Sequence, residues 1–350
     1  MMKFKLSFMI AAGMFAVVAA LPAVASNSPL HSNTTLYDVT ERGYLRCGVN
    51  VGIMGFSAID QTGEWAGLDV DFCRAFAAAV LGDKNAVEFV PLSAEARFPA
   101  LQAGEIDVLT RNTTRTFRRE TGLGLDFAAV TYYDGQGFLA PKSLGITSLR
   151  DLKPGMRICF HTHTTTEINL ANYAKTHNLD YKPVPFDSIE EAKTGLFLGR
   201  CDLFTTDRGA LASIRATEAP NPEDYVILPD IISKEPLGAF VREGDTQWRN
   251  IVRWVILATI QAEEEGFTAA NVESMKASPD PAVKTMLGAL PGLGESLGLD
   301  DQWMYRVIRQ VGNYGEIFAR NLGPDTPVSL DRGLNALWPD GGLMYAPPMG

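Results

Sequence analysis

The sequence predicts an α/β protein of two lobes, each built on a doubly wound sheet, with two crossing strands as the hinge between them. Strand and helix patterns alternate over residues 44–110, and the same alternation returns over residues 156–216. Extended segments lie between the two units and after the second one. Alternating strands and helices favour parallel sheets covered by helices, and a chain of 350 residues usually divides into two domains.

The first unit begins with a strand over residues 44–49, followed by a turn-rich loop over residues 52–63. Residues 69–81 are predicted to be helical, because their apolar side chains recur at helical spacing and Gly82 follows them. The remaining elements are a strand over residues 86–91, a short helix capped by Ser93 that ends near Gly104, and a strand over residues 106–110.

The second unit repeats this layout. Its predicted elements are strands over residues 156–160, 181–186 and 201–205, and helices over residues 167–177, 188–198 (capped by Ser188) and 207–216. Residues 130–138 and 225–229 are the expected connectors, and two long helices follow over residues 248–266 and 300–321. We therefore expect residues 36–134 and 230–350 to form one lobe and residues 135–229 the other.

The first 25 residues have the pattern of a cleaved signal peptide. Lys3 and Lys5 precede an apolar run that ends in Ala23-Val24-Ala25. We expect export to the periplasm and a mature chain that starts near Ser26 with a polar leader up to residue 37; an uncleaved anchor is the alternative. Removing two lysines and no acidic residue changes the net charge from −10 to −12, which argues against a nucleic-acid partner.

The four cysteines are expected to form disulfides in an exported chain. Three pairings are possible, and we favour Cys47–Cys73 with Cys159–Cys201, because each then closes a loop within one half of the chain. Four buried free thiols are the alternative.

Four polar stretches follow predicted strands and should face a cleft between the lobes, since ligands of open α/β sheets bind at the carboxyl ends of strands. They are Gly55-Phe56-Ser57 with Trp65 nearby, residues 110–119, residues 161–166 and residues 205–208. The second stretch contains Arg111 and Arg119, and arginine holds a carboxylate through two parallel hydrogen bonds. Asp207 in the fourth stretch is suited to an ammonium group, so the cleft has the two contacts that an α-amino acid needs.

Each of these features also has a structural alternative. The threonines before Glu167 fit a capping box, Asp207 fits a helix N-cap, and the arginines fit a solvated surface. His161 and His163 could begin a metal site, but zinc needs a third protein ligand and no further histidine lies nearby in the sequence. We expect no metal; one or both imidazoles would line the cleft, where a protonated histidine would add to the binding of an anion.

At this point the sequence resembles the polar amino-acid-binding proteins of bacterial ABC importers, and in particular their general L-amino-acid-binding branch. The segments that carry the resemblance are residues 67–73 (GLDVDFC), 111–114 (RNTT), 205–208 (TTDR), 311–318 (VGNYGEIF) and 332–338 (RGLNALW). The resemblance implies the type II periplasmic binding protein fold, an L-amino acid as ligand, ABC permease subunits as partners, and no catalytic role or cofactor. We expect a monomer.

The resemblance also implies roles for individual residues. Arg119 would pair with the α-carboxylate of the ligand, helped by Thr114 and Thr165. Asp207 would pair with the α-ammonium, helped by Asn112, and Phe56 would pack over the ligand. The sequence departs from the family where His163 replaces a usual glycine, Thr162 a small residue and Arg115 an aromatic residue, which leaves the substrate range open.

Other functions remain to be weighed. Periplasmic dehydratases of the cyclohexadienyl type share the fold that the resemblance implies, but they need a general acid over the substrate, for which Glu167 is the candidate. A metal-binding protein built on the histidine pair is a second alternative. A binding protein that serves a sensor in place of a permease is a third, and the sequence does not separate it from a transport protein.

Overall fold

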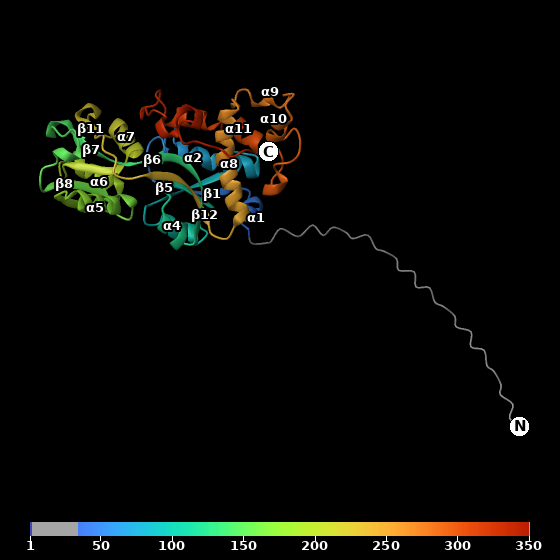
Figure 1. The fold of residues 1–350 in the computed structure, drawn as a ribbon, viewed down its shortest axis with the longest axis horizontal. Coiled ribbons are helices and arrows are strands. Elements are labelled where there is room, and N and C mark those ends of the chain that lie inside the picture. The colour runs from blue at the N-terminus through green and yellow to red at the C-terminus, as the bar shows by residue number, and fades with distance from the viewer. Residues whose placement is uncertain (2–33, 350) are drawn as a thin grey trace.

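The computed structural model describes Met1 and residues 34–349 of the chain. Two lobes lie side by side, each built on a five-stranded sheet with helices on its faces (Figure 1). The predicted signal peptide and its cleavage site lie outside the described residues. No helix in the described part of the chain has both the length and the apolar character needed to cross a membrane.

The large lobe contains a sheet with the strand order β4-β1-β5-β12-β6. Its strands are β1 (Leu45–Asn50), β4 (Val87–Leu92), β5 (Val108–Thr114), β6 (Leu125–Asp134) and β12 (Glu235–Arg242), and a short hairpin of β2 (Ala58–Ile59) and β3 (Trp65–Ala66) lies beside them. Strand β1 runs parallel to both β4 and β5, whereas β12 runs antiparallel to both β5 and β6. The sheet is therefore mixed.

The small lobe repeats this design with the strand order β11-β7-β10-β8-β9. Its strands are β7 (Gln136–Pro141), β8 (Met156–His161), β9 (Tyr181–Phe186), β10 (Leu203–Asp207) and β11 (Tyr225–Ile227). Here β7 alone is reversed, because it is antiparallel to both β10 and β11. The strands predicted within the two repeated units are parallel, as expected. In each sheet the reversed strand lies outside those units and is the first one after the chain crosses from the other lobe.

The helices cover these sheets. The large lobe has α1 (Thr35–Arg42), α2 (Leu68–Leu81), α3 (Arg97–Gln102), α4 (Phe117–Gly122), α8 (Thr246–Glu264), α9 (Val272–Met275), α10 (Pro281–Met286), α11 (Trp303–Gln310) and α12 (Tyr314–Asn321); the small lobe has α5 (Thr165–His177), α6 (Ile189–Phe197) and α7 (Arg208–Thr217). Helices α2, α8 and α11 pack against one another, with Trp248 and Trp303 fully buried among them.

Many predicted boundaries shift by a few residues, and three further differences have a local cause. The helix predicted over residues 300–321 is two helices, because Gly312 has a φ of 99° and Asn313 starts α12 with a capping box to Glu316. The polar leader ends earlier than expected, since α1 already begins at Thr35. Ser93 does not cap α3: it accepts a hydrogen bond from the Ala96 N–H one turn before the helix begins.

The hinge consists of two chain crossings. The first is the predicted connector, in which β6 passes into β7 through Gly135. A side chain on Gly135 would lie 2.5 Å from Ile231 and 3.0 Å from the Ser233 carbonyl, so residues 228–234 form the second crossing close beside it. The connector predicted at residues 225–229 is mostly the edge strand β11. The sheets draw their strands from the segments expected for the two lobes, and the predicted lobe boundaries themselves stay predictions.

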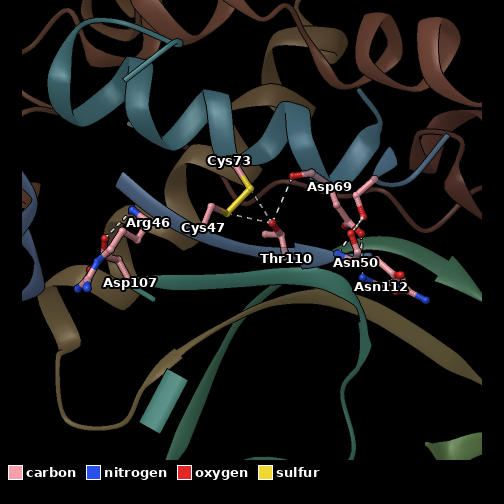
Figure 2. Close-up of a disulfide and its surroundings, with 9 residues drawn as sticks. Arg46, Cys47, Asn50, Asp69, Cys73, Asp107, Thr110 and Asn112 are labelled. Carbon is pink, nitrogen blue, oxygen red and sulfur yellow. Dashed lines mark hydrogen bonds and ion pairs between the residues drawn. A yellow bond between two sulfur atoms is a disulfide. The ribbon is translucent and has the colours of Figure 1, made fainter. Parts of the chain in front are cut away.

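Both predicted disulfides are present, one in each lobe. Cys47 on β1 is bonded to Cys73 on α2 with Cα atoms 6.0 Å apart, and Cys159 on β8 is bonded to Cys201 with Cα atoms 5.7 Å apart. Figure 2 shows the first bond, with the hydroxyl of Thr110 on β5 beside both sulfurs. This bond fixes α2 to the strand whose carboxyl end carries Asn50, a residue of the interlobe cavity.

Candidate functional site

A cavity lies between the two lobes at the carboxyl ends of their central strands. Its volume is about 30 Å³. The lining residues are Asn50, Ile53, Arg97, Arg111, Asn112, Thr114 and Arg119 from the large lobe, and His161, Thr164, Thr165, Thr166, Ile189, Thr206 and Asp207 from the small lobe. The walls are close together, so a ligand of amino-acid size would enter through an opening of the hinge.

Seven of the ten side chains predicted to bind a ligand line this cavity: Arg111, Asn112, Thr114, Arg119, His161, Thr165 and Asp207. The other three do not. Phe56 is buried at the lobe interface, where its ring meets Tyr132 edge-on at 5.3 Å and leaves no room for a side chain on Gly209 of α7. Trp65 packs on Phe89 away from the cavity, and His163 is exposed.

Arg119 lies in the cavity lining and uses only some of its N–H donors within the protein. Its Nη1 donates to the Thr114 carbonyl at 2.9 Å, and its guanidinium lies 5.2 Å from the centre of the Phe98 ring. Burial lowers the pKa of Arg119, and the carboxylates of Glu235 and Asp207 oppose that shift. A guanidinium has five N–H donors, so this geometry leaves Arg119 able to bind a ligand carboxylate.

Arg111 lies deeper than Arg119. Its Nε donates to the Leu92 carbonyl at 2.7 Å, and burial lowers its pKa to about 10 while nearby Asp69 opposes the shift. The solvated-surface alternative holds only for Arg118, which is exposed, and for Arg115, which forms a two-point ion pair with Glu120 outside the cavity.

Asp207 is the acidic group of the cavity. It ends β10 and precedes α7, yet its side chain makes no cap hydrogen bond, so the N-cap alternative is wrong. The residue is only 7% exposed, and no donor among residues 34–349 reaches its carboxylate. Burial raises the pKa of Asp207 well above its usual value, and the carboxylates of Glu235 and Asp134 raise it further. A ligand ammonium would supply both the missing charge and the missing hydrogen bonds.

Asn112 lies on the cavity wall formed by the large lobe and has an unusual backbone conformation. Its φ is 33°, its N–H donates to the Asp69 carboxylate at 2.8 Å, and its side-chain oxygen accepts from Asn50 at 2.8 Å. Asparagine is one of the few residues that tolerate a left-handed backbone. The predicted help of Asn112 to an ammonium group would therefore depend on an oxygen that already has one partner.

The threonine segment does not form a capping box. Thr164 precedes α5 without a side-chain cap bond and donates instead to the His161 carbonyl at 2.8 Å. Glu167, the candidate general acid, is exposed and is not among the lining residues. The first residues of α5 thus face the cavity with backbone N–H groups at the positive end of a 13-residue helix.

His161 is a neutral side chain in this environment. It lies 3.1 Å from the Asp187 carbonyl through Nε2, and burial, followed by the charge of Arg111, lowers its pKa to about 4. The expectation of a protonated histidine that helps to bind an anion was therefore wrong for neutral pH. No group of three or more potential metal ligands occurs in the part of the chain that the structure describes.

Two residues of importance were missed in the sequence. Arg97, on the first turn of α3, is nearly fully buried in the cavity wall; a lone arginine just past a strand end was the available signal. Glu235, at the start of β12, accepts hydrogen bonds from the hydroxyls of Thr114 and Thr165 at 2.5 and 3.0 Å. These two hydroxyls were expected to help bind a ligand carboxylate. No local sequence pattern indicates that Glu235 is their hydrogen-bond acceptor.

Known proteins resemble this chain over nearly its whole length. Residues 45–266 match the model of the bacterial extracellular solute-binding proteins, family 3. The general L-amino acid-binding periplasmic protein AapJ of Rhizobium johnstonii is 52% identical over 336 residues, covering 95% of this chain and 97% of that protein. The glutamate/glutamine/aspartate/asparagine-binding protein BztA of Rhodobacter capsulatus is 51% identical over 332 residues, covering 95% of this chain and 96% of that protein.

The structural comparison agrees with the sequence comparison. A solved structure of an ABC transporter periplasmic binding protein from Brucella ovis, with glutathione bound, is similar to this fold with a TM-score of 0.87 at 51% sequence identity. The match covers 90% of this chain and 99% of that one.

Proposed function

The chain belongs to the bacterial extracellular solute-binding proteins, family 3, and from that premise we propose that it captures L-amino acids in the interlobe cavity and delivers them to the permease of an ABC importer. Membership in this family confirms the predicted resemblance and the predicted type II fold, here with two mixed sheets. The protein would act in the periplasm, as a monomer, after removal of its signal peptide.

One observation carries the proposal: Arg119 and Asp207 line the same cavity from opposite lobes, and each has hydrogen-bonding capacity that the protein leaves unused. An α-amino acid carries the complementary pair, a carboxylate for Arg119 and an ammonium for Asp207. Binding both groups at once connects the lobes, so ligand binding and hinge closure become one event. The protein would act through this closure, without a chemical step.

The relatives support the same ligand class. AapJ is described as a general L-amino-acid binder, and BztA as a binder of four named amino acids. The Brucella protein holds glutathione, whose γ-glutamyl end has a free α-carboxylate and α-ammonium, so the same two contacts fit it. The cyclohexadienyl dehydratase alternative loses its candidate acid, because Glu167 is exposed outside the cavity. Service to a sensor in place of a permease remains the second candidate.

The test is a thermal melt of the mature protein after carried-over ligand has been removed by partial unfolding and refolding. A ligand that binds only the native state raises its stability, by about 2.7 kcal/mol at a concentration of 100 times Kd. We expect the melting temperature to rise with L-amino acids and to stay unchanged with their D-enantiomers and with amines or carboxylic acids that lack one of the two groups. No shift with any L-amino acid would overturn the proposal.

A further inference from the structure

The first turn of α7 determines where the carboxylate of Asp207 lies, because this helix begins directly after that residue. Asp207 occupies the N-cap position, yet its side chain makes no cap hydrogen bond. The first N–H groups of a helix have no partner within the helix, and a buried N–H group without an acceptor is costly. Another part of the chain must therefore accept hydrogen bonds from the start of α7.

The hinge supplies these acceptors. The N–H of Arg208 donates to the Gly135 carbonyl at 2.9 Å. The N–H of Gly209 donates to Oδ2 of Asp134, also at 2.9 Å. Asp134 is the last residue of β6 and pairs with Glu235 in the sheet of the large lobe, whereas α7 packs on β7 and β10 of the small lobe. The first turn of α7 is thus capped from the other lobe, by residues at the point where the chain crosses the hinge.

The side chain of Asp134 is fixed in this orientation. Its Oδ1 accepts a hydrogen bond from the Gly135 N–H at 2.7 Å, which ties the carboxylate to the crossing itself. Burial raises the pKa of Asp134 to about 6, and the hydrogen bonds from Gly135 and Gly209 oppose that rise. The N-terminal end of a helix also favours a negative charge. Asp134 therefore binds α7 through its charge as well as through its hydrogen bond.

The contact requires a glycine in the first turn of α7. A Cβ atom on Gly209 would lie 2.9 Å from Oδ2 of Asp134 and 2.7 Å from the ring of Phe56. Both distances are too short for a side-chain carbon, so only glycine allows α7 to approach the crossing this closely. The sequence at the start of the helix and the carboxylate at the hinge are matched to each other.

We propose that Asp134 is a positioning residue for ligand binding: it caps α7 across the hinge and thereby leaves the carboxylate of Asp207 free to bind the α-ammonium group. The inference rests on the proposed function, since it takes Asp207 as a ligand-binding residue. Asp134 itself is not among the residues that line the cavity. Without it, the usual acceptor for the Gly209 N–H is the side chain at the N-cap position, which is Asp207. That carboxylate would then be drawn away from the ligand.

The first test is a calorimetric titration of the stripped protein with L-glutamate, L-glutamine and L-leucine. Asp134→Ala should reduce the affinity for every ligand that the wild type binds by about tenfold or more, because the charged hydrogen bond to the ammonium is weakened. Asp134→Asn keeps an acceptor for the Gly209 N–H and should bind within about threefold of the wild type. Asp134→Glu keeps the charge but displaces the acceptor by one methylene group, so it should lose about tenfold.

The matched control is Asp230→Ala. Asp230 lies on the second crossing, and its carboxylate accepts a hydrogen bond from the Leu149 N–H at 3.0 Å, at the start of a short helix of the small lobe. It therefore makes the same kind of contact at the same hinge, but to an element without a residue of the cavity. This substitution should leave the affinity for all three ligands unchanged.

The second test measures the melting temperature of ligand-free variants in slightly alkaline buffer. Asp207→Ala should not lower the melting temperature of the wild type, because Asp207 caps nothing there. In the Asp134→Ala background the same substitution should lower it by about 2–4 °C, since Asp207 has then become the cap of α7. A residue that only supports the fold would not produce this dependence of one substitution on the other.

Each failure has a distinct meaning. Wild-type affinity in Asp134→Ala, or an equal effect of Asp207→Ala on the melting temperature in both backgrounds, would overturn the inference and leave the proposed function standing. No binding of any L-amino acid by the wild type would overturn the proposed function and the inference with it. If Asp134→Ala does not fold, the other two variants decide: tighter binding by Asp134→Glu than by Asp134→Asn would overturn the inference.

Discussion

Thr165 at the start of α5 in the small lobe donates a 3.0 Å hydrogen bond to Glu235 at the start of β12 in the large lobe. Asn169, one turn further along α5, donates to the other oxygen of the same carboxylate at 2.7 Å. Thr114 and Ser233 complete the set at 2.5 and 2.6 Å, and Glu235 is only 1% exposed. A single carboxylate at the hinge therefore joins the two lobes before any ligand is considered.

Glu235→Gln should weaken this junction. The amide of glutamine has one acceptor oxygen and one N–H₂ donor, so it can accept from only one side of the set. The hydroxyls that face its N–H₂ group must turn to act as acceptors. We expect a loss of about 1–3 kcal/mol in the free energy of unfolding, measured by urea denaturation, and a larger radius of gyration of the ligand-free protein in small-angle X-ray scattering. Saturating ligand should return the radius to the wild-type value, because it favours the closed state.

The matched control is Glu243→Gln, on the exposed residue that follows β12. It removes the same charge from the same segment and should alter neither the stability nor the radius of gyration. Wild-type values of both quantities in Glu235→Gln would contradict the role of this carboxylate as a junction between the lobes.

Asp207→Asn tests the proposed contact with the ammonium group. The substitution keeps the shape of the side chain and removes the charge, so the affinity for L-amino acids should fall by at least about 100-fold. The measurement is a calorimetric titration of the stripped protein, with Asp224→Asn, an exposed residue of the same lobe, as the control. Unchanged affinity in Asp207→Asn would refute the assignment of this residue.

The same variant should not destabilise the empty protein. The pKa of Asp207 is raised in the fold, because the carboxylate is buried beside Glu235 and Asp134. A carboxyl group whose folded pKa is raised stabilises the fold at low pH and loses that contribution as the pH rises through the folded value. Without ligand, Asp207→Asn should therefore melt at the wild-type temperature or above it at pH 8. A marked decrease would mean that Asp207 has a structural role.

Much of the cavity could be predicted because the local sequence pattern shows where each strand ends. Arg111 lies in the second half of β5, and His161 and Asp207 are the last residues of β8 and β10. The carboxyl ends of neighbouring parallel strands meet at one edge of a sheet. The reversed direction of β7 and β12 could not be predicted in this way, since it depends on which lobe the chain has just left. The break at Gly312 could have been: Asn313 and Glu316 have the spacing of a capping box.

The electrostatics of the cavity were not accessible from the sequence. Whether His161 is charged depends on its burial and on Arg111, which is 50 positions earlier in the chain. Arg97 is distinguished only by the absence of acceptors around it, a property of packing. Glu235 is likewise far in sequence from Thr114 and Thr165, from whose hydroxyls it accepts hydrogen bonds. The sequence indicates which chemical groups lie in the cleft. The fold determines which of them lack a hydrogen-bond partner within the described part of the protein.

Ligand binding should release protons in the pH range in which Asp207 of the empty protein titrates. Burial, together with the carboxylates of Glu235 and Asp134, raises the pKa of this carboxyl group. An ammonium group beside it favours the ionised form and lowers the pKa, so the proton must leave when an amino acid binds. The affinity should then increase with pH, by at most about tenfold per unit. Titrations in two buffers with different ionisation enthalpies measure the protons released, and Asp207→Asn should reduce that number. Proton uptake in place of release would contradict the prediction.

His163→Gly should stabilise the protein without affecting its ligand. His163 has a φ of 58°, a left-handed conformation that glycine adopts without strain, and its side chain is exposed outside the cavity. Relief of that strain should raise the free energy of unfolding by about 1 kcal/mol, measured by urea denaturation. His163→Ala is the matched control: it removes the imidazole but keeps a Cβ atom, so it should give no such gain. A change of more than about threefold in amino-acid affinity in both variants would instead place the imidazole at the ligand, as the sequence first suggested.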